Sequence, residues 1–311
     1  MTFQNSNHRG LRDYRQDRKN PLKYIKSGRG AAWFSALAWG ARGRRFKSRR
    51  PDVSFWKPLG AILLILITND DGINSEGIKC LKEKLSQKHE VYVVAPDRER
   101  TCSAHSITLH KPLRIVRHSD KVYSTNGTPA DCVVLGIRCV LQKRPDLVIS
   151  GINGGPNMGQ DIFYSGTCAA AREGAFLGIQ SLSVSIDGRE RLKYEDAAKV
   201  ILRIVEIIEE NSLPKGVFLN VNIPNIRYEE VRGFMITTPG FRIYEDVVIE
   251  RVDPRGKKYY WIGGATDRFK PKKGTDFFAV SKGYVSITPI DAYIYESRSQ
   301  NLVKKIFGRL S

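Results

Sequence analysis

Residues 61–72 read AILLILITNDDG: seven consecutive apolar residues are followed at once by a polar turn with two adjacent carboxylates. A strand that is covered by helices on both faces of a parallel sheet needs such a continuous apolar run. Asp70 and Asp71 then lie just past the carboxyl end of the strand, where folds of this class bind their ligands. This segment therefore predicts both an architecture and the position of a site.

The alternation of strands and helices continues downstream. Buried strands are expected at residues 91–95, 146–150, 181–186 and 216–223, shorter strands at 113–116 and 122–125, and helices at 75–87, 129–141, 165–177 and 194–211. Strands that alternate with helices indicate a parallel sheet with crossover connections. We therefore expect an α/β protein with a Rossmann-like, doubly wound, mostly parallel sheet.

The pattern changes near residue 232, where helical spacing stops. The segments FMITT, RIYEDVVIE, KKYYWIGG and YVSIT are typical of extended strands joined by Gly and Pro turns, and a helix is expected near 299–309. We divide the chain into an extension at residues 1–60, a Rossmann-like domain at 61–232 that holds the candidate site, and a smaller β-rich C-terminal region at 233–311.

Most of the excess positive charge lies in the first fifth of the chain. The formal net charge is +19, and residues 1–60 hold 15 Lys/Arg against 3 Asp/Glu, a net of +12. We expect these residues to form a disordered basic extension, and any contact with nucleic acid to depend on it. A targeting segment or a surface-binding arm is the alternative.

Composition also excludes several classes of protein. The five cysteines show no CxxC spacing, which argues against structural zinc and fits a reducing compartment. No apolar run reaches 18 residues, so we expect no membrane span and a cytoplasmic protein. Neither GxxxxGK[ST] nor GxGxxG occurs, which argues against a P-loop NTPase and a dinucleotide oxidoreductase.

Two more polar loops follow buried strands of the predicted sheet. Residues 96–106 carry two arginines, His105 and the hydroxyls of Thr101 and Ser103. Residues 150–159, SGINGGPNMG, combine a glycine-rich backbone that can cradle an anion with asparagine oxygens that can bind a hard metal. Taken singly, all three loops are also explained by turn and helix-capping chemistry. His105 without a partner is weak support for a catalytic triad.

The helix expected at 165–177 begins directly after these loops. Either Ser165 or Thr167 can cap it, and a helix N-terminus is a natural phosphate site. Since the carboxyl ends of parallel strands meet at one sheet edge, carboxylates, hydroxyls, amide oxygens and anion-binding backbone should gather there. That combination is typical of metal-assisted phosphoryl transfer, with Mg²⁺, Mn²⁺ or Ca²⁺ favoured over zinc by the oxygen ligands.

Several of these motifs occur in the order of a known family. They are ILLILITNDDGINSEGI, VYVVAPDRER, HSITLHKPLR, NGTPADCV, PDLVISGINGGPNMGQDIFYSGT and GYVSITPI. The chain resembles the stationary-phase survival protein SurE family over residues 62–295. Proteins of that family are 5′/3′-nucleotidases, and some also cleave exopolyphosphate. The resemblance says nothing about residues 1–60.

The resemblance implies one divalent metal ion per subunit, Mg²⁺ or Mn²⁺, bound by Asp70, Asp71, Thr101 and Asn153. The family usually has serine where this chain has Thr101, which keeps the hydroxyl but adds a methyl group, so Ser103 is an alternative ligand. Asp70 and Asp71 are also the expected catalytic residues. We expect phosphate contacts from Asn157, Ser165, Gly166 and Thr167.

The expected reaction is hydrolysis of nucleoside 5′- and 3′-monophosphates to nucleoside and phosphate, with exopolyphosphate as a further substrate. The resemblance implies a homodimer or homotetramer assembled through the C-terminal region. Two other classes stay open. One is a binding protein that acts through the basic extension, and the other is a Rossmann-type transferase that binds a nucleotide without releasing phosphate.

Overall fold

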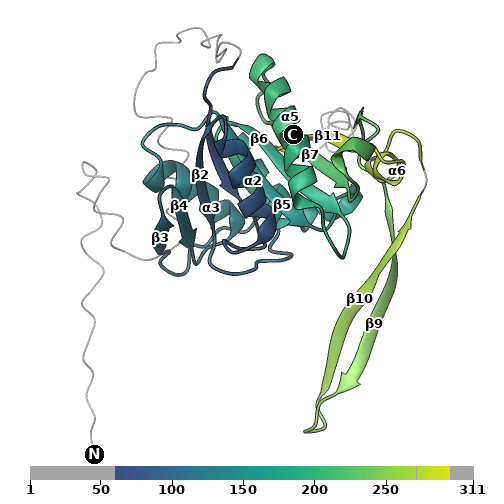
Figure 1. Ribbon diagram of the computed structural model, residues 1–311. Coiled ribbons are helices and arrows are strands. Elements are labelled where there is room, and N and C mark those ends of the chain that lie inside the picture. The colour runs from purple at the N-terminus through teal and green to yellow at the C-terminus, as the bar shows by residue number, and fades with distance from the viewer. Residues whose placement is uncertain (1–59, 271, 295–311) are drawn as a thin grey trace, which may run out of the picture. The chain divides into compact units, whose positions relative to one another are not determined.

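The computed structural model describes residues 60–270 and 272–294. Within them, nine strands form one mixed sheet and two further strands form a separate pair (Figure 1). The expectations for the basic extension and for a C-terminal helix near 299–309 concern segments outside the described residues. The predicted α/β class is confirmed.

The nine-stranded sheet has the order β3-β4-β2-β1-β5-β6-β7-β11-β8. Its strands are β1 (Leu64–Thr68), β2 (Glu90–Pro96), β3 (Ile115–Ser119), β4 (Val122–Thr125), β5 (Leu147–Gly154), β6 (Gln180–Asp187), β7 (Val217–Pro224), β8 (Phe234–Ile236) and β11 (Val285–Asp291). The six central strands from β4 to β7 are parallel. β3 runs antiparallel to β4, and β11 antiparallel to β7, so the sheet is mostly parallel, as predicted.

The chain reverses its direction of travel across the sheet between β1 and β5. From β1 it passes to β2 and β4 on one side, then returns to β5 beside β1 and continues through β6 to β7. β1 and β5 pair from Ile65 with Leu147 to Thr68 with Ser150. The carboxyl ends of these two strands form the switch point of a doubly wound sheet, the place where folds of this class bind ligands.

Helices cover both faces of this sheet. α2 (Glu76–Ser86) and α5 (Tyr194–Glu210) pack on one face, and α3 (Pro129–Leu135) and α4 (Gly166–Phe176) on the other (Figure 1). A hydrophobic core lies between the sheet and the helices on each face. Ile65 and Ile67 belong to the core beneath α2 and α5, and Leu66 belongs to the core beneath α3 and α4. This two-sided burial is the reason that the strand reads as an unbroken apolar run.

Two helical details differ from the sequence pattern. Beyond α3 the chain continues as a π-helical turn, Gly136–Val140, where a single helix over 129–141 was expected. A short helix, α6 (Asp276–Ser281), has no counterpart among the expectations, because six residues are too few to show helical periodicity. In the described part of the chain, no helix has the length and apolar character that crossing a membrane requires.

The C-terminal region contributes to two separate sheets. β8 and β11 extend the main sheet, whereas β9 (Arg242–Val252) and β10 (Lys258–Phe269) pair antiparallel with each other. We call the β9–β10 pair the arm. The sequence predicts all four strands, but their alternating or apolar patterns do not show which sheet each strand joins.

Candidate functional site

The adjacent carboxylates lie at the switch point, just past the end of β1. Asp70 is buried, with 6% of its surface exposed, and its Oδ1 accepts a 2.5 Å hydrogen bond from Thr167 Oγ1 in α4. Its backbone oxygen accepts from Arg100 N at 2.7 Å, and Asp71 Oδ2 accepts from Gly154 N at 3.4 Å. The loop after β2, the end of β5 and the start of α4 therefore all meet at this pair.

The aspartates do not serve as helix caps. α2 begins at Glu76 with Ser75 as its N-cap, so the capping explanation for the NDDG turn does not hold. Gly72 closes the turn with φ of 95°, a conformation that suits glycine. A Cβ at this position would lie 3.0 Å from the backbone carbonyl carbon of Arg98, so the turn fits tightly against the loop after β2.

The surroundings disfavour charge on both carboxylates. Burial raises the pKa of Asp70, although the hydrogen bond from Thr167 acts in the opposite direction. Burial, followed by the neighbouring charge of Asp70, raises the pKa of Asp71 from 3.8 to about 6. Two carboxylates in this position are stabilised in their ionised form by a cation between or beside them.

Thr101 and Ser103, in the loop after β2, take different positions. Ser103 Oγ is buried and has no hydrogen-bond partner within residues 60–270 and 272–294. A Cβ on Gly166 would lie 2.6 Å from Ser103 Oγ and 3.0 Å from Asp70 Cβ, so both side chains pack against the first residue of α4. Thr101 is exposed, and its hydroxyl donates to Glu99. The structure thus brings Ser103 beside Asp70.

The same loop is fastened to α4. Ala104 N donates to Tyr164 O at 3.1 Å, and His105 Nε2 lies 3.0 Å from Glu173 Oε2. The His105 ring also stacks on Phe176, with 5.6 Å between ring centroids. Sequence reasoning found His105 but missed Glu173, because the two residues are 68 positions apart and no local pattern connects them.

β5 extends to Gly154, beyond the expected strand end at residue 150, so Asn153 lies in the strand and Asn157 in the loop that follows it. Asn153 Nδ2 donates to Gly155 O at 2.7 Å, which leaves Oδ1 as the side-chain atom able to bind a cation. Asn157 is buried, and its Nδ2 donates to Ser185 Oγ at 2.8 Å while its backbone N donates to Asn222 Oδ1 at 2.9 Å. These bonds give Asn157 a framework role, and its phosphate contact stays a prediction.

The N-terminus of α4 lies against the carboxylates. Ser165 is its N-cap and accepts from Cys168 N at 3.0 Å, which decides between the two candidate caps. Thr167 instead bonds Asp70. The first backbone N–H groups of a helix have no partner within the helix and favour an anion. The backbone N–H of Thr167 also bonds Asp70, so this helix end and the carboxylate pair lie side by side.

The oxygen atoms gathered here fit a hard divalent cation. In the described part of the chain, no three His, Cys, Asp or Glu side chains form a metal-binding group. The site would rest on Asp70 and Asp71, completed by the amide oxygen of Asn153 and a hydroxyl from the loop after β2. Such ligands suit Mg²⁺ or Mn²⁺. The raised pKa values and the unpartnered hydroxyl of Ser103 fit a cation in this place.

Comparison with known proteins agrees with this geometry. The family model described as "Survival protein SurE" matches residues 65–246, which include every predicted site residue. Proteins named 5′-nucleotidase SurE from Geotalea daltonii and Aquifex aeolicus are 42% and 47% identical to this chain, covering 78% and 72% of it and 98% and 90% of their own lengths. The crystal structure of the SurE protein from Aquifex aeolicus aligns with a TM-score of 0.72 at 44% identity, over 78% of this chain and 99% of that one.

The first prediction concerns the aspartate pair. Asp70→Asn and Asp71→Asn should each lower turnover on the order of 10²-fold or more, because each removes a charged ligand of the expected cation. The pKa of Asp71 is higher in the folded protein than its ordinary value, so the metal-free protein should lose stability as the pH rises from about 4 to about 6. Asp71→Asn should flatten that fall in Tm. Asp120→Asn, at an exposed ion pair, is the control.

The second prediction separates the two candidate hydroxyls. The family resemblance assigns the ligand role to Thr101, although the structure places the unpartnered Ser103 hydroxyl beside Asp70 and bonds Thr101 to Glu99. On that assignment, Thr101→Val, which keeps the side-chain shape and removes the oxygen, should weaken Mn²⁺ binding and turnover, whereas Thr101→Ser should be tolerated. Ser103→Ala should have the smaller effect. Calorimetric titration with Mn²⁺ and phosphate release measure the two consequences separately. A damaging Ser103→Ala together with a silent Thr101→Val would transfer the ligand role to Ser103.

Proposed function

Because this chain belongs to the SurE family, we propose that it is a nucleotidase, a phosphoric monoester hydrolase that converts nucleoside 5′-monophosphates into nucleoside and phosphate. One observation supports this function most directly. Asp70 and Asp71 lie at the end of β1 against the N-terminus of α4. Hydrolysis of a phosphomonoester needs a cation beside a group that binds the phosphate, and this arrangement of carboxylates and helix end can supply both.

The cation site of this proposal consists of Asp70, Asp71, Asn153 and the Thr101 hydroxyl, with one Mg²⁺ or Mn²⁺ per subunit. When bound, the cation supplies Lewis-acid stabilisation of the phosphoryl oxygens. The Thr101 hydroxyl now donates to Glu99, so binding a cation requires it to turn away from that carboxylate. The bond from Asn153 Nδ2 to Gly155 keeps the amide in the orientation in which Oδ1 is available.

The start of α4 binds the phosphate in this proposal. The first backbone N–H groups and the positive end of the helix attract the phosphate charge. Gly166 allows the close approach of the helix, since any Cβ there would collide with Ser103 Oγ. Thr167 then fixes the helix end to Asp70. Asp70 and Asp71 are adjacent, unlike the Asp-x-Asp pair of haloacid-dehalogenase phosphatases, so water is the expected nucleophile.

Two further substrates belong to the same proposal. Nucleoside 3′-monophosphates and exopolyphosphate also present a terminal phosphate, and the recognition described above is directed at that group. Cation and helix end both contact phosphoryl oxygens, so the position of the phosphate on the sugar is not restricted by them. The base and the remaining sugar contacts would have to distinguish these substrates.

The competing classes make different predictions. A binding protein that acts through residues 1–60 would lose its function when they are deleted, and a transferase would bind a nucleotide without releasing phosphate. The nucleotidase described here should retain cation-dependent activity after the deletion, because all of its site residues lie between 70 and 167.

Phosphate release provides the third prediction. The full chain and a variant without residues 1–60 should both release phosphate from nucleoside 5′-monophosphates with Mg²⁺ or Mn²⁺, and neither should do so with EDTA. Nucleoside 3′-monophosphates and polyphosphate complete the panel. No release from any 5′-monophosphate would refute the nucleotidase, and release that persists in EDTA would refute the cation.

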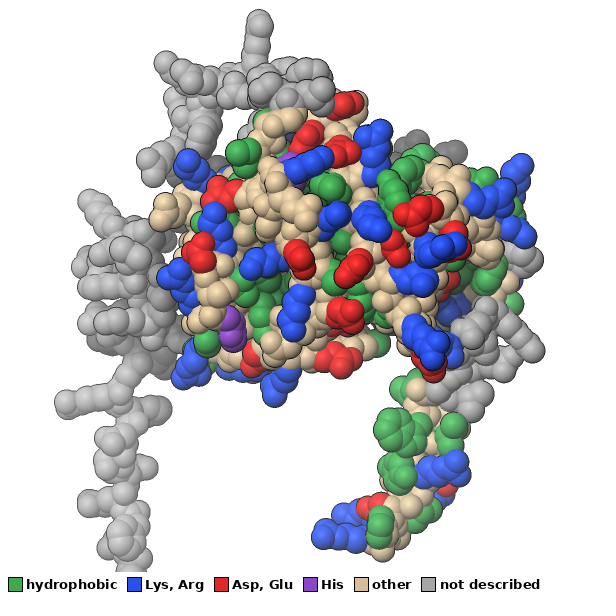
Figure 2. Space-filling model, in the orientation of Figure 1, with side chains coloured by type: hydrophobic (Ala, Val, Ile, Leu, Met, Phe, Trp, Pro, Cys, Tyr) green, Lys and Arg blue, Asp and Glu red, His purple; other side chains and the backbone are tan. Residues whose placement is uncertain are grey.

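A second copy of the chain is the partner that we propose for the arm. Figure 2 shows hydrophobic side chains along it, and Val248, Val252, Tyr260, Trp261 and Ile262 are 56–91% exposed. In the described part of the chain, β9 and β10 pair with each other alone. Apolar strands with open edges favour pairing with another chain, as in a homodimer or homotetramer.

The fourth prediction follows from this exposed surface. Ile262→Lys should shift the protein toward smaller assemblies, because a charge in a buried apolar contact costs free energy. Ile207→Lys, at an exposed isoleucine on α5, is the matched control and should leave the assembly unchanged. Sedimentation velocity measures both. An unchanged assembly in Ile262→Lys would argue that the arm is not the interface.

A further inference from the structure

One segment joins the two halves of the candidate site. We call the proposed cation ligands, which include Asn153, the cation side of the site, and the start of α4 at Ser165 the phosphate side. The chain between Asn153 and Ser165 passes through residues 157–161. We call residues 157–161 the bridge segment. Because it connects the two sides along the chain, its position sets how Asn153 lies relative to the start of α4.

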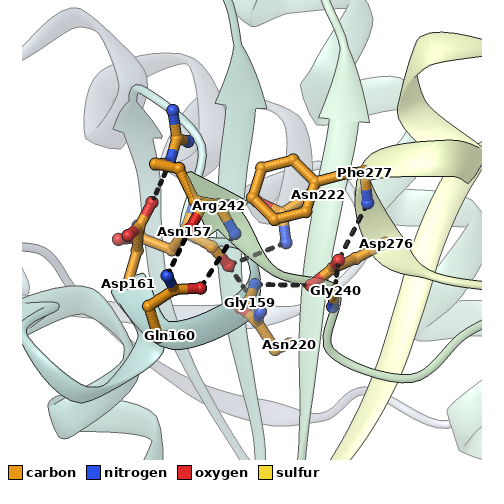
Figure 3. Close-up of polar contacts among 10 residues, drawn as sticks. All are labelled: Asn157, Gly159, Gln160, Asp161, Asn220, Asn222, Gly240, Arg242, Asp276 and Phe277. Carbon is orange, nitrogen blue, oxygen red and sulfur yellow. Dashed lines mark hydrogen bonds and ion pairs between the residues drawn. The ribbon is translucent and has the colours of Figure 1, made fainter. Parts of the chain in front are cut away.

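The arm begins directly on the bridge segment (Figure 3). The side chain of Gln160 exchanges two hydrogen bonds with the backbone of Arg242, the first residue of β9: Nε2 donates to Arg242 O at 2.7 Å, and Arg242 N donates to Oε1 at 2.9 Å. Arg242 Nε also donates to Asp161 Oδ2 at 2.7 Å. The Arg242 and Asp161 side chains are only 12% and 18% exposed, so this ion pair is shielded from water.

The other strand of the arm ends on the same segment. Phe269, the last residue of β10, stacks on Phe277 with 5.1 Å between ring centroids. Phe277 forms an apolar cluster with Met158 of the bridge segment. Both strands of the arm are therefore anchored at the bridge segment, one by polar bonds and one by packing.

A single buried carboxylate ties these parts together. Asp276, which has no exposed surface, accepts from Gly159 N through Oδ2 and from Gly240 N through Oδ1, both at 2.7 Å (Figure 3). A Cβ on Gly159 would lie 2.8 Å from Gly240 O, so the two backbones are in close contact. One side chain thus bonds the bridge segment and the residue that leads into the arm.

The opposite side of the bridge segment is held by the central sheet. Asn220 and Asn222 on β7 donate to Asn157 O at 2.7 and 3.1 Å. These bonds lie inside the protein, where a backbone oxygen left without a partner is costly. The bridge segment is thus fixed between β7 on one side and the base of the arm on the other.

We propose that Arg242 and Asp276 are positioning residues for the hydrolysis, and that the base of the arm holds the cation side and the phosphate side of the site in register. This inference rests on the proposed function. Neither residue is placed in contact with substrate, so both act through the bridge segment. A displacement of about 1 Å in such a site costs up to about 10²-fold in rate.

Arg242→Ala is the main test, because it removes the ion pair with Asp161 and leaves the backbone bonds to Gln160 possible. We expect kcat for a nucleoside 5′-monophosphate to fall about tenfold with KM changed less than threefold, since alignment is lost while the phosphate-binding helix end remains. Arg242→Lys should restore part of the rate. The kcat of the double variant Arg242→Ala with Asp161→Ala should be no lower than the kcat of Arg242→Ala alone.

Two controls distinguish positioning from general destabilisation. Arg227→Ala breaks an exposed ion pair with Glu230 elsewhere and should leave kcat unchanged. Ile204→Ala, in the core of α5, should lower Tm at least as much as Arg242→Ala without lowering kcat. A loss of kcat in Ile204→Ala that matches the one in Arg242→Ala would overturn the inference.

Hydrogen exchange gives a readout that does not depend on activity. In Arg242→Ala, amides of residues 153–161 should exchange faster, while those of α2 should be unchanged. If Arg242→Ala shows the same exchange in the bridge segment and the same kcat as the wild type, the positioning role is overturned, and the proposed nucleotidase function is unaffected. If the wild-type chain releases no phosphate, the proposed function fails. Exchange rates in Arg242→Ala that equal those of the wild type would then also overturn the anchoring of the bridge segment.

Discussion

The hydrogen bond from Thr167 Oγ1 to the buried carboxylate of Asp70 constrains how the segments of the candidate site are arranged at the carboxyl ends of the parallel strands. A carboxylate at 6% exposure is costly unless its oxygens are bonded, so a donor must reach it at the end of β1. Thr167 can do so only when α4 starts directly against that strand end. Gly166 allows this approach, and Ser103 fills the remaining space beside it.

Buried polar side chains hold the bridge segment of the site in one position. Asn220 and Asn222 face the bridge segment from β7, where an apolar residue would leave the backbone oxygen of Asn157 without a partner. Asp276 does the same for Gly159 from the C-terminal region. Loops rich in glycine do not hold one conformation by themselves, so the framework around this loop has to supply it.

The local chemistry of the site could be predicted from the sequence. The apolar run before Asp70 and Asp71 locates the pair at a strand end, and a helix start at Ser165 places a candidate anion site nearby. Each of these signals is a property of a short segment. The sequence could not show that Asn157 would be buried, because the donors and acceptors that surround it come from β6 and β7.

The sequence by itself determined the fold class and the strands and helices around the site, and it supplied the candidate residues for a cation and a phosphate, since periodicity and residue chemistry are local. Only the tertiary structure decided the strand order, the pairing of His105 with Glu173 and the anchoring of the arm by Arg242. The last two depend on contacts between residues that are 68 and 81 positions apart in the chain. Such contacts form because burial and hydrogen bonding are satisfied across the whole molecule, and no short segment records them.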